Sequence, residues 1–275
     1  MIYLKSYCYN KHELVFVIAN LMEGYDYIDK LLLYEYNFTH TGIPKNYELE
    51  SLITLIPKHL QSKLYYKKVD ITNYVEYAYE NGPLIHEINE PIQRSWAFND
   101  PNITFKDDDI IIDIDIDEII YQSSYIPLIK ELEEKNRPLS IKMNQFFYKN
   151  NYLWTDLIFT SPAIYKYNMT GSKIIKGLKI KNFRDVEIKT SKIYGCHMSW
   201  VMPVDYMLKK LHSYSHPEYR HFCDKKILEK AIEDKKYVFN LNRPFNIQEL
   251  NINDPRIPIF LQKKNIFDYL KVIYI

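Results

Sequence analysis

Glycine is scarce in this chain, with six residues among 275. No two of them stand at the spacing of G-x-G-x-x-G, and none belongs to a G-x-x-x-x-G-K segment. The first pattern forms the phosphate-binding turn of dinucleotide-binding proteins, and the second forms the phosphate-binding loop of many nucleoside triphosphatases. Both classes are therefore excluded in their usual form, and a nucleotide would have to be held without a glycine-rich loop.

An excess of charge of one sign is also missing. Lysine and arginine number 36 and aspartate and glutamate 35, which gives a formal net charge of +1. A protein dedicated to nucleic acid needs a basic surface that neutralises phosphates, so no nucleic-acid partner is expected. Hydrophobic residues make up 47% of the chain, which excludes a disordered tail and leaves ample material for the core of one domain.

Cysteines and long apolar runs are few as well. The three cysteines, Cys8, Cys196 and Cys223, match neither a zinc motif nor a disulfide framework, which favours a reducing compartment. The longest apolar stretch, 14–22, is interrupted by Asn20 and is too short to span a bilayer. The first ten residues lack the charged and apolar regions of a signal peptide. These absences predict a cytoplasmic protein without a transmembrane segment.

Hydrophobic patterning predicts strands that alternate with helices in the first half of the chain, and hence an α/β domain with a mainly parallel sheet. The segment 13–25 fits a buried strand or a helix equally well. Strands are expected at 1–9, 30–36, 64–71, 109–117, 139–148, 152–160 and 193–199. Helices are expected at 47–60, at 91–98 with Pro91 in its first turn, at 127–135, at 203–212 and at 225–235.

An acidic segment at 107–119 is the most distinctive feature of the sequence. In a strand, Asp113, Asp115 and Asp117 would share one face at a spacing of roughly 7 Å, and their mutual repulsion must be offset by water, basic side chains or a divalent cation. A solvated edge strand with protective charges is one interpretation. The run of isoleucines at the beginning of the strand, which is typical of a central strand, and the Asp-Glu at its carboxyl end favour a binding site instead.

The acidic segment resembles the D-x-D-E-I-P motif of glycosyltransferase family 17, which includes β-1,4-N-acetylglucosaminyltransferases. Three further blocks resemble the family in the same order, so that the resemblance runs from about residue 13 to 236. They are 28–45, the N-E-P-I-Q-R of 89–94, and the G-C-H-M-S-W of 195–200 followed by Lys210 and the S-Y-S-H-P-E of 213–218. Cys196, Ile120 and Tyr121 depart from the family pattern, which bears on acceptor choice more than on donor chemistry.

The resemblance implies a GT-A fold, a Rossmann-like mainly parallel sheet flanked by helices. It places the glycosyltransferase domain at 1–236, with 237–275 as an extension packed on the same domain. It also implies transfer of a sugar, expected to be N-acetylglucosamine, from a UDP-sugar to a glycan hydroxyl with inversion. Mn²⁺ or Mg²⁺ would be held by Asp115, Asp117 and His197, although a buried histidine can also be a hydrogen-bonded core residue.

Donor contacts are expected from one further set of residues: Glu35, Asn37, Thr39, Lys45, Arg94, Asp115 and His216. Each has a plainer alternative. Asn and Thr often cap loops, Arg94 can pair with Glu90 four residues earlier on a helix, and Lys45 follows a proline on what would be a solvated loop.

Inverting transfer also needs a general base that takes the acceptor's proton. Glu218 is the first candidate and Asp156 the second. Trp154 could stack on an acceptor sugar, although a single tryptophan is more often part of the core. Two other functions remain open: a metal-dependent phosphohydrolase, and a domain that binds sugar or nucleotide-sugar without turnover.

Overall fold

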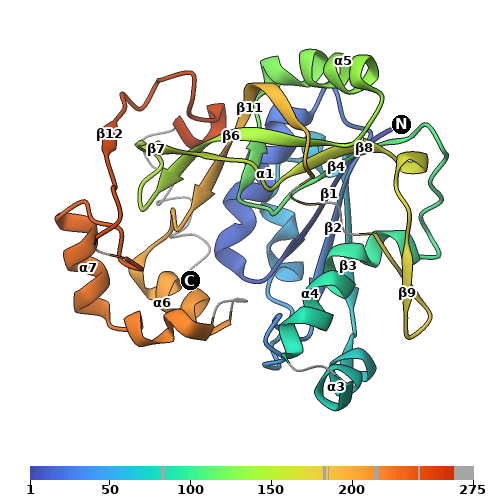
Figure 1. Cartoon of the computed structure of the whole chain (residues 1–275), viewed down its shortest axis with the longest axis horizontal. Helices are drawn as coiled ribbons and strands as arrows, with labels where there is room; N and C mark the ends of the chain where they lie inside the picture. Colours follow the sequence, from blue (N-terminus) through green and yellow to red (C-terminus); the bar gives the residue numbers. More distant parts are fainter. Residues whose placement is uncertain (82–83, 182–183, 185, 214–216, 241, 263–275) are drawn as a thin grey trace.

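The computed structural model describes residues 1–81, 84–181, 184, 186–213, 217–240 and 242–262. Their strands form a large sheet whose N-terminal half is parallel, in the order β3–β2–β1–β4. This order places the first strand of the chain near the middle of the sheet (Figure 1). The bounds are β1 Ile2–Cys8, β2 Lys30–Tyr36, β3 Leu64–Val69 and β4 Ile110–Asp113.

The other half of the sheet is mixed. β8 lies antiparallel between β4 and β6, and the long β11 runs parallel to β6. Two antiparallel reversals restore the direction, so β6 and β11 point the same way as β1 and β4. The bounds are β5 Glu118–Ile120, β6 Leu139–Phe147, β7 Tyr152–Phe159, β8 Ala163–Lys166, β11 Lys189–Ser199 and β12 Ile247–Glu249, with a separate hairpin of β9 Lys173–Ile175 and β10 Leu178–Ile180.

Helices cover both faces of the sheet (Figure 1). Buried side chains of α1 and α5 share one large core with the sheet, and residues of α3 pack with the opposite face. α6 and α7 enclose a second cluster with the far ends of β6 and β7. The bounds are α1 Leu14–Gly24, α2 Lys58–Gln61, α3 Thr72–Asn81, α4 Ile85–Ser95, α5 Tyr125–Lys135, α6 Val204–Ser213 and α7 Lys225–Glu233.

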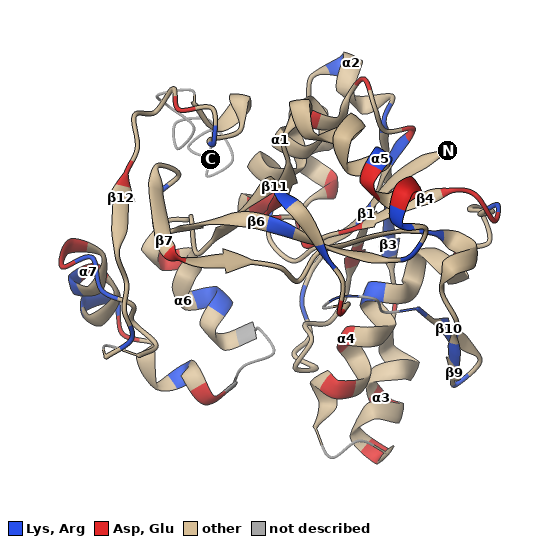
Figure 2. Ribbon diagram, turned by 45° about the horizontal axis from the view of Figure 1, so that its top comes forward, with Lys and Arg blue, Asp and Glu red and all other residues tan. Residues whose placement is uncertain are grey.

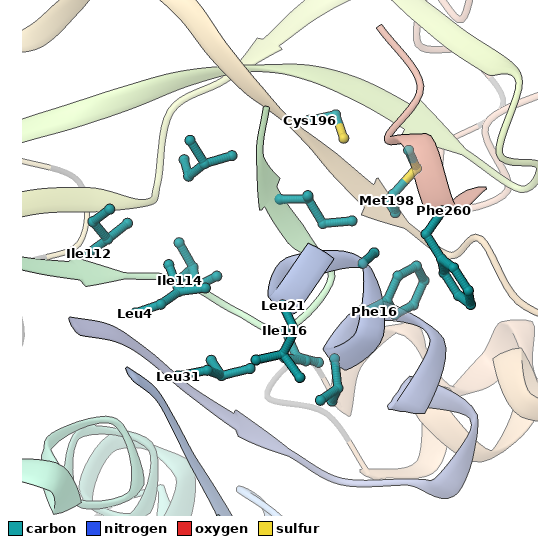
Figure 3. Close-up of a cluster of buried hydrophobic side chains, with 14 of the residues drawn as sticks. Leu4, Phe16, Leu21, Leu31, Ile112, Ile114, Ile116, Cys196, Met198 and Phe260 are labelled. Carbon is teal, nitrogen blue, oxygen red and sulfur yellow. The ribbon is translucent and has the colours of Figure 1, made fainter. Parts of the chain in front are cut away.

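Alternation along the strands separates core from site. Leu4 of β1 points into the main core, together with Ile112, Ile114 and Ile116 of the acidic segment (Figure 3). Cys196 and Met198 of β11 reach the same core from the other side (Figure 3). Within β4 and β11, where successive side chains leave the strand on opposite faces, Asp113 and His197 point away from this core.

The predicted α/β class, single domain and helix-flanked sheet are confirmed, with the parallel order restricted to part of the sheet. Segment 13–25 is a helix; nearly all of α1 is buried, so its sequence lacks the polar stripe that distinguishes a helix from a strand. One predicted helix was wrong in detail, and one helix was missed. The predicted 47–60 helix is a 3₁₀ turn, Glu50–Leu55, followed by the short α2, and α3 was not predicted at all.

The predictions for the acidic strand and for the helix at 91–98 also need correction. The strand ends at Asp113 instead of Asp117, because the Glu118 carboxylate accepts the Asp115 N–H at 2.6 Å and closes a turn. β4 has neighbours on both sides, β1 and β8, so it is not an edge strand. α4 begins at Ile85, so Pro91 lies inside the helix and not in its first turn.

The chain beyond residue 236 adds β12 to the sheet edge next to β7. A 3₁₀ turn, Ile259–Gln262, then packs against α1, and Phe260 enters the main core (Figure 3). These contacts tie the described part of the predicted extension to the domain; its residues 263–275 lie outside the described ones. Among the described residues, no helix combines the length and the apolar character needed to cross a membrane.

Candidate functional site

A cleft of about 290 Å³ opens at the carboxyl ends of β1, β4 and β11. Parallel strands bring their carboxyl ends to one edge of a sheet, and the loops there supply the ligand-binding residues of α/β proteins. Helices α4 and α6 contribute the remaining wall. The lining residues are Tyr7, Tyr9, Asn10, Glu13, His40, Glu90, Arg94, Asp115, Ile116, Asp117, His197, Ser199, Trp200 and Lys210.

Asp115 lies among cationic and hydroxyl donors. Its Oδ1 lies 2.5 Å from Arg94 Nη1, 2.7 Å from the Tyr7 hydroxyl and 3.3 Å from Arg184 Nη1. Burial alone would raise the pKa of Asp115, but the two guanidinium groups outweigh it and hold that pKa well below its usual range. Asp115 is therefore a carboxylate near neutral pH.

Arg94 joins the acidic turn to α4. Its guanidinium stays protonated at any ordinary pH. It pairs with Asp115 and also with Glu90, which lies one helical turn earlier on α4 at a distance of 2.9 Å. The ion pair with Glu90 foreseen as an alternative is thus present, and Arg94 lines the cleft as well. Below it, the buried Lys5 donates to the Arg94 carbonyl at 2.5 Å and to Asp113 at 2.8 Å, which fixes the end of α4 against β1 and β4.

Asp117 faces a lysine and a histidine. Its Oδ2 is 3.2 Å from Lys210 Nζ of α6, and its Oδ1 is 3.7 Å from His197 Nε2 of β11. Burial opposes the charge of Lys210, but Asp117 and then Glu13 raise its pKa, so the lysine is cationic. The Asp117 carbonyl accepts the Met198 N–H at 2.7 Å, which fixes the turn against β11.

His197 is a neutral imidazole at physiological pH. Burial lowers its pKa to about 4, and the attraction of Asp117 for the charged form does not compensate. Its ring packs against that of Phe159 in a tilted arrangement, with a centroid distance of 4.0 Å, and its Nδ1 lies 2.9 Å from Gln145 Oε1. The other ring nitrogen, Nε2, is the one that faces Asp117.

Strand β11 pairs with β5, and Gly195 allows the two strands to lie close together. A Cβ at that position would lie 2.3 Å from the carbonyl oxygen of Ile119. Strand β11 therefore approaches β5 closely only with glycine there, and His197, two residues later, is brought opposite the acidic turn.

The model of glycosyltransferase family 17 matches residues 9–252. The chain belongs to glycosyltransferase family 17. A search of curated proteins found none that matches it. Membership of the family makes the protein a glycosyltransferase with a sugar donor and an acceptor, and the cleft lies within the matched segment apart from Tyr7.

Two side chains of this glycosyltransferase cleft are of the types that bind divalent cations. Within the described ranges, no group of three or more His, Cys, Asp and Glu side chains is arranged as a metal site. Asp117 Oδ1 and His197 Nε2 nevertheless lie 3.7 Å apart, and Mn²⁺ and Mg²⁺ commonly take few protein ligands and complete their shell with water and phosphate oxygens. Asp115 is already engaged by Arg94, Arg184 and Tyr7.

Four of the residues expected to contact the donor are not among those lining the cleft. Buried Glu35 accepts hydrogen bonds from the Glu48 N–H at 2.6 Å and from the Tyr66 hydroxyl at 2.6 Å, and Lys45 pairs with Glu35 at 3.4 Å.

The other two residues hold their own loop. Asn37 forms hydrogen bonds with Asp70, Thr72 and the Ile71 N–H, while the Thr39 hydroxyl accepts one from the Ile43 N–H at 3.0 Å. These contacts are those of loop capping, and their role in donor binding stays a prediction.

The acceptor-side candidates also lie away from the lining. Trp154 is buried in an aromatic cluster, and its Nε1–H donates to Asp156 at 3.1 Å. Asp156 is at the surface and holds Asn246, next to β12, through the backbone at 2.6 Å. Glu218 is exposed in the 3₁₀ turn Pro217–Phe222, and His216 lies outside the described residues.

Sequence reasoning missed several groups of the glycosyltransferase cleft. Glu13 and His40 follow β1 and β2, so their position after predicted strands was a usable signal. Burial raises the pKa of Glu13 to about 7 against the opposing hydrogen bond from the Tyr9 N–H. No local sequence pattern could have indicated Arg184 or Gln145. They matter because they contact the distant cleft residues Asp115 and His197.

Proposed function

We propose that this chain is a metal-dependent, inverting glycosyltransferase that moves N-acetylglucosamine from UDP-N-acetylglucosamine to a glycan hydroxyl. The observation that carries the proposal is the facing pair of Asp117 and His197 in a cleft that also holds the cations Arg94 and Lys210. Family membership supports the transferase, and the departing group of a UDP-sugar is a diphosphate that needs such a set of charges.

Arg94 and Lys210 would bind the donor diphosphate. A planar guanidinium recognises phosphate oxygens through paired hydrogen bonds, and the lysine supplies a compact positive charge. Asp117 and His197 would hold the metal. When bound there, Mn²⁺ or Mg²⁺ supplies Lewis-acid stabilisation of the charge that develops on the leaving UDP. Asp115 would then fix the orientation of Arg94, and Arg184 would hold Asp115 in place, since both guanidinium groups contact that carboxylate.

The general base must lie on the face of the sugar opposite UDP, so it is distinct from the metal ligands. Glu218 is the first candidate and Asp156 the second. The structure adds Glu13, which lines the cleft and whose pKa of about 7 is suited to accepting a proton near neutral pH. Its carboxylate also accepts the Tyr9 N–H at 2.6 Å, so substitution there affects the loop after β1 as well.

A UDP-release assay tests the transferase. Purified protein is incubated with a panel of nucleotide sugars and Mn²⁺, with and without glycan acceptors. UDP that forms from UDP-N-acetylglucosamine only when an acceptor is present supports the proposal. UDP formed equally without acceptor indicates a hydrolase, and binding of the donor without any UDP indicates a binding domain; either result rejects the proposal.

Amide variants of the three candidates identify the general base. Glu13→Gln, Glu218→Gln and Asp156→Asn each keep the shape of the side chain and remove its ability to take a proton. The base variant should lose turnover by about 10²–10⁴-fold while donor affinity measured by calorimetry stays within a few-fold. A variant that loses donor affinity together with turnover is assigned to binding, and one with wild-type turnover is excluded as the base.

A further inference from the structure

The side chain of Gln145 makes two hydrogen bonds that fix its orientation. Gln145 lies on β6, directly across from His197 on the parallel β11, and its side chain is 2% exposed. Its Nε2 donates to the Phe146 carbonyl at 2.8 Å, and its Oε1 lies 2.9 Å from His197 Nδ1. Because a carbonyl can only accept, the amide NH₂ must face Phe146 and the amide oxygen must face the histidine.

This orientation decides where the proton of His197 resides. An amide oxygen can only accept, so the bond to Gln145 requires a protonated Nδ1. In the neutral imidazole, which is the form that can bind a cation, Nε2 then has a lone pair. That lone pair faces Asp117 Oδ1 across 3.7 Å, which is longer than a hydrogen bond. Two electron-pair donors therefore face each other at the cleft wall.

We propose that Gln145 is a positioning residue that locks His197 in the tautomer protonated at Nδ1, so that Nε2 is presented to a divalent cation shared with Asp117. The cation part rests on the proposed function, whereas the tautomer does not. In metal sites, the ring nitrogen that does not bind the metal commonly donates to a neighbouring acceptor, which fixes the ring and raises its basicity. The Phe159 ring packs against the imidazole with the two ring planes 37° apart, and the bond to Gln145 fixes which edge of the imidazole faces Asp117.

Nitrogen-15 NMR of the histidine side chains in the metal-free protein tests the tautomer. The His197 signals are identified by their loss in His197→Ala. We expect Nδ1 to have the chemical shift of a protonated ring nitrogen and Nε2 that of an unprotonated one. A proton on Nε2 in the wild-type protein overturns the proposal, and this measurement needs neither metal nor activity.

Variants of Gln145 test whether this residue sets the tautomer. Gln145→Met fills a similar volume without an acceptor, so the Nδ1-protonated form should lose its preference. Gln145→Glu keeps an oxygen facing Nδ1 and should retain it. Asn144→Leu is the matched control, because it removes the neighbouring β6 amide, which donates to Tyr121 at 3.0 Å, and leaves the histidine contact intact. An unchanged tautomer in Gln145→Met overturns the proposal.

Calorimetric titration with Mn²⁺ alone tests the consequence. Gln145→Met should bind Mn²⁺ about 10–100-fold more weakly than the wild type, as expected for loss of such an orienting partner, while Gln145→Glu and Asn144→Leu stay within a few-fold. Wild-type Mn²⁺ affinity in Gln145→Met contradicts the positioning role. Wild-type Mn²⁺ affinity in His197→Ala instead rejects the metal assignment of the proposed function, and the NMR result on the tautomer still stands.

Discussion

The acidic residues between Ile112 and Glu118 have different partners although they are spaced alike in the sequence. Asp113 is buried with Lys5 and holds the end of α4 through it. Asp115 is bound by guanidinium groups, and Asp117 faces Lys210 and His197. Each charge is therefore offset by a separate cationic group. This arrangement offsets the mutual repulsion of the carboxylates that the sequence pattern implies. Of the three, only Asp115 and Asp117 line the cleft.

Substitution of Asp117 should separate function from folding. Asp117→Asn preserves shape and the backbone contact with Met198 but removes a metal-binding oxygen charge. We expect the protein to stay folded, with a melting temperature lowered by the loss of the Lys210 ion pair, and kcat/KM to fall on the order of hundreds-fold or more, the effect of losing several kcal/mol of transition-state stabilisation. Steady-state kinetics on Asp117→Asn and on the surface control Asp205→Asn measure the difference. Undiminished turnover in excess EDTA would contradict the metal role.

His12 should make the protein sensitive to acid. It is buried against Tyr206, and neither ring nitrogen has a hydrogen-bond partner in the described part of the chain. Burial, with Lys210 and Lys209 nearby, lowers its pKa to about 3 from 6.5. Between these values the unfolded chain binds a proton that the folded chain does not, so this residue's contribution to stability is present above pH 6.5 and is lost as pH falls towards 3.

The variant His12→Phe removes this linkage. Its melting temperature, compared with that of the wild type, should therefore show a larger gain at pH 5 than at pH 8. Thermal unfolding of both proteins across this pH range is the measurement. A gain that is the same at both values would show that His12 does not titrate differently in the folded and unfolded states.

At the scale of the element, β11 is the strand that carries the site. It ends at the cleft with His197 and Ser199, while the alternate residues Cys196 and Met198 enter the main core. It pairs with β6 on one side and β5 on the other, so its position sets the distance between His197 and the acidic turn. Trp200 then leaves the strand with a φ of 59°, a left-handed conformation that turns the chain towards α6.

Gly195→Ala should disturb the site through the strand. The added methyl group would meet the Ile119 carbonyl, a backbone atom that cannot rotate away. We expect a loss of about 1–3 kcal/mol in the free energy of unfolding, together with weaker Mn²⁺ binding, because β5 and β11 must separate. Chemical denaturation and metal titration report the two effects. Gly171→Ala serves as the control, since a Cβ there meets no atom within 4 Å.

At the scale of the whole molecule, the cleft gathers residues from across the chain. Strands β1, β4 and β11 contribute from positions almost 200 residues apart, and α4 and α6 close the wall. A ligand that contacts all of these elements binds only the folded state. Donor binding should therefore be visible as stabilisation of the entire domain.

UDP together with Mn²⁺ should raise the melting temperature substantially, and UDP alone far less. A ligand at 100 times its dissociation constant adds about 2.7 kcal/mol to the free energy of unfolding of a protein that binds it only when folded. Thermal shift measurements with UDP, GDP and CMP, each with and without Mn²⁺, test this. Equal shifts from the three nucleotides would show that the uridine assignment is wrong.

Local sequence was enough to determine the α/β class, most strands and the identity of several cleft residues. Apolar alternation depends on neighbours one or two positions apart, and the acidic segment stood out in such a short window, whereas Arg94 and His197 were predicted from the blocks that resemble the family. The helical state of α1 was not determined, because a segment buried on all sides has no periodic polar face.

Only the tertiary structure decided which partner each charged group has. Lys5 and Asp113, Arg184 and Asp115, or Gln145 and His197 are separated by 52 to 108 residues, and their pairing follows from strand order and register. The same holds for Glu13, whose raised pKa is a property of its burial. Charge and hydrogen-bond energies depend on distances in space, so the sequence supplied the groups and the fold determined the chemistry available to them.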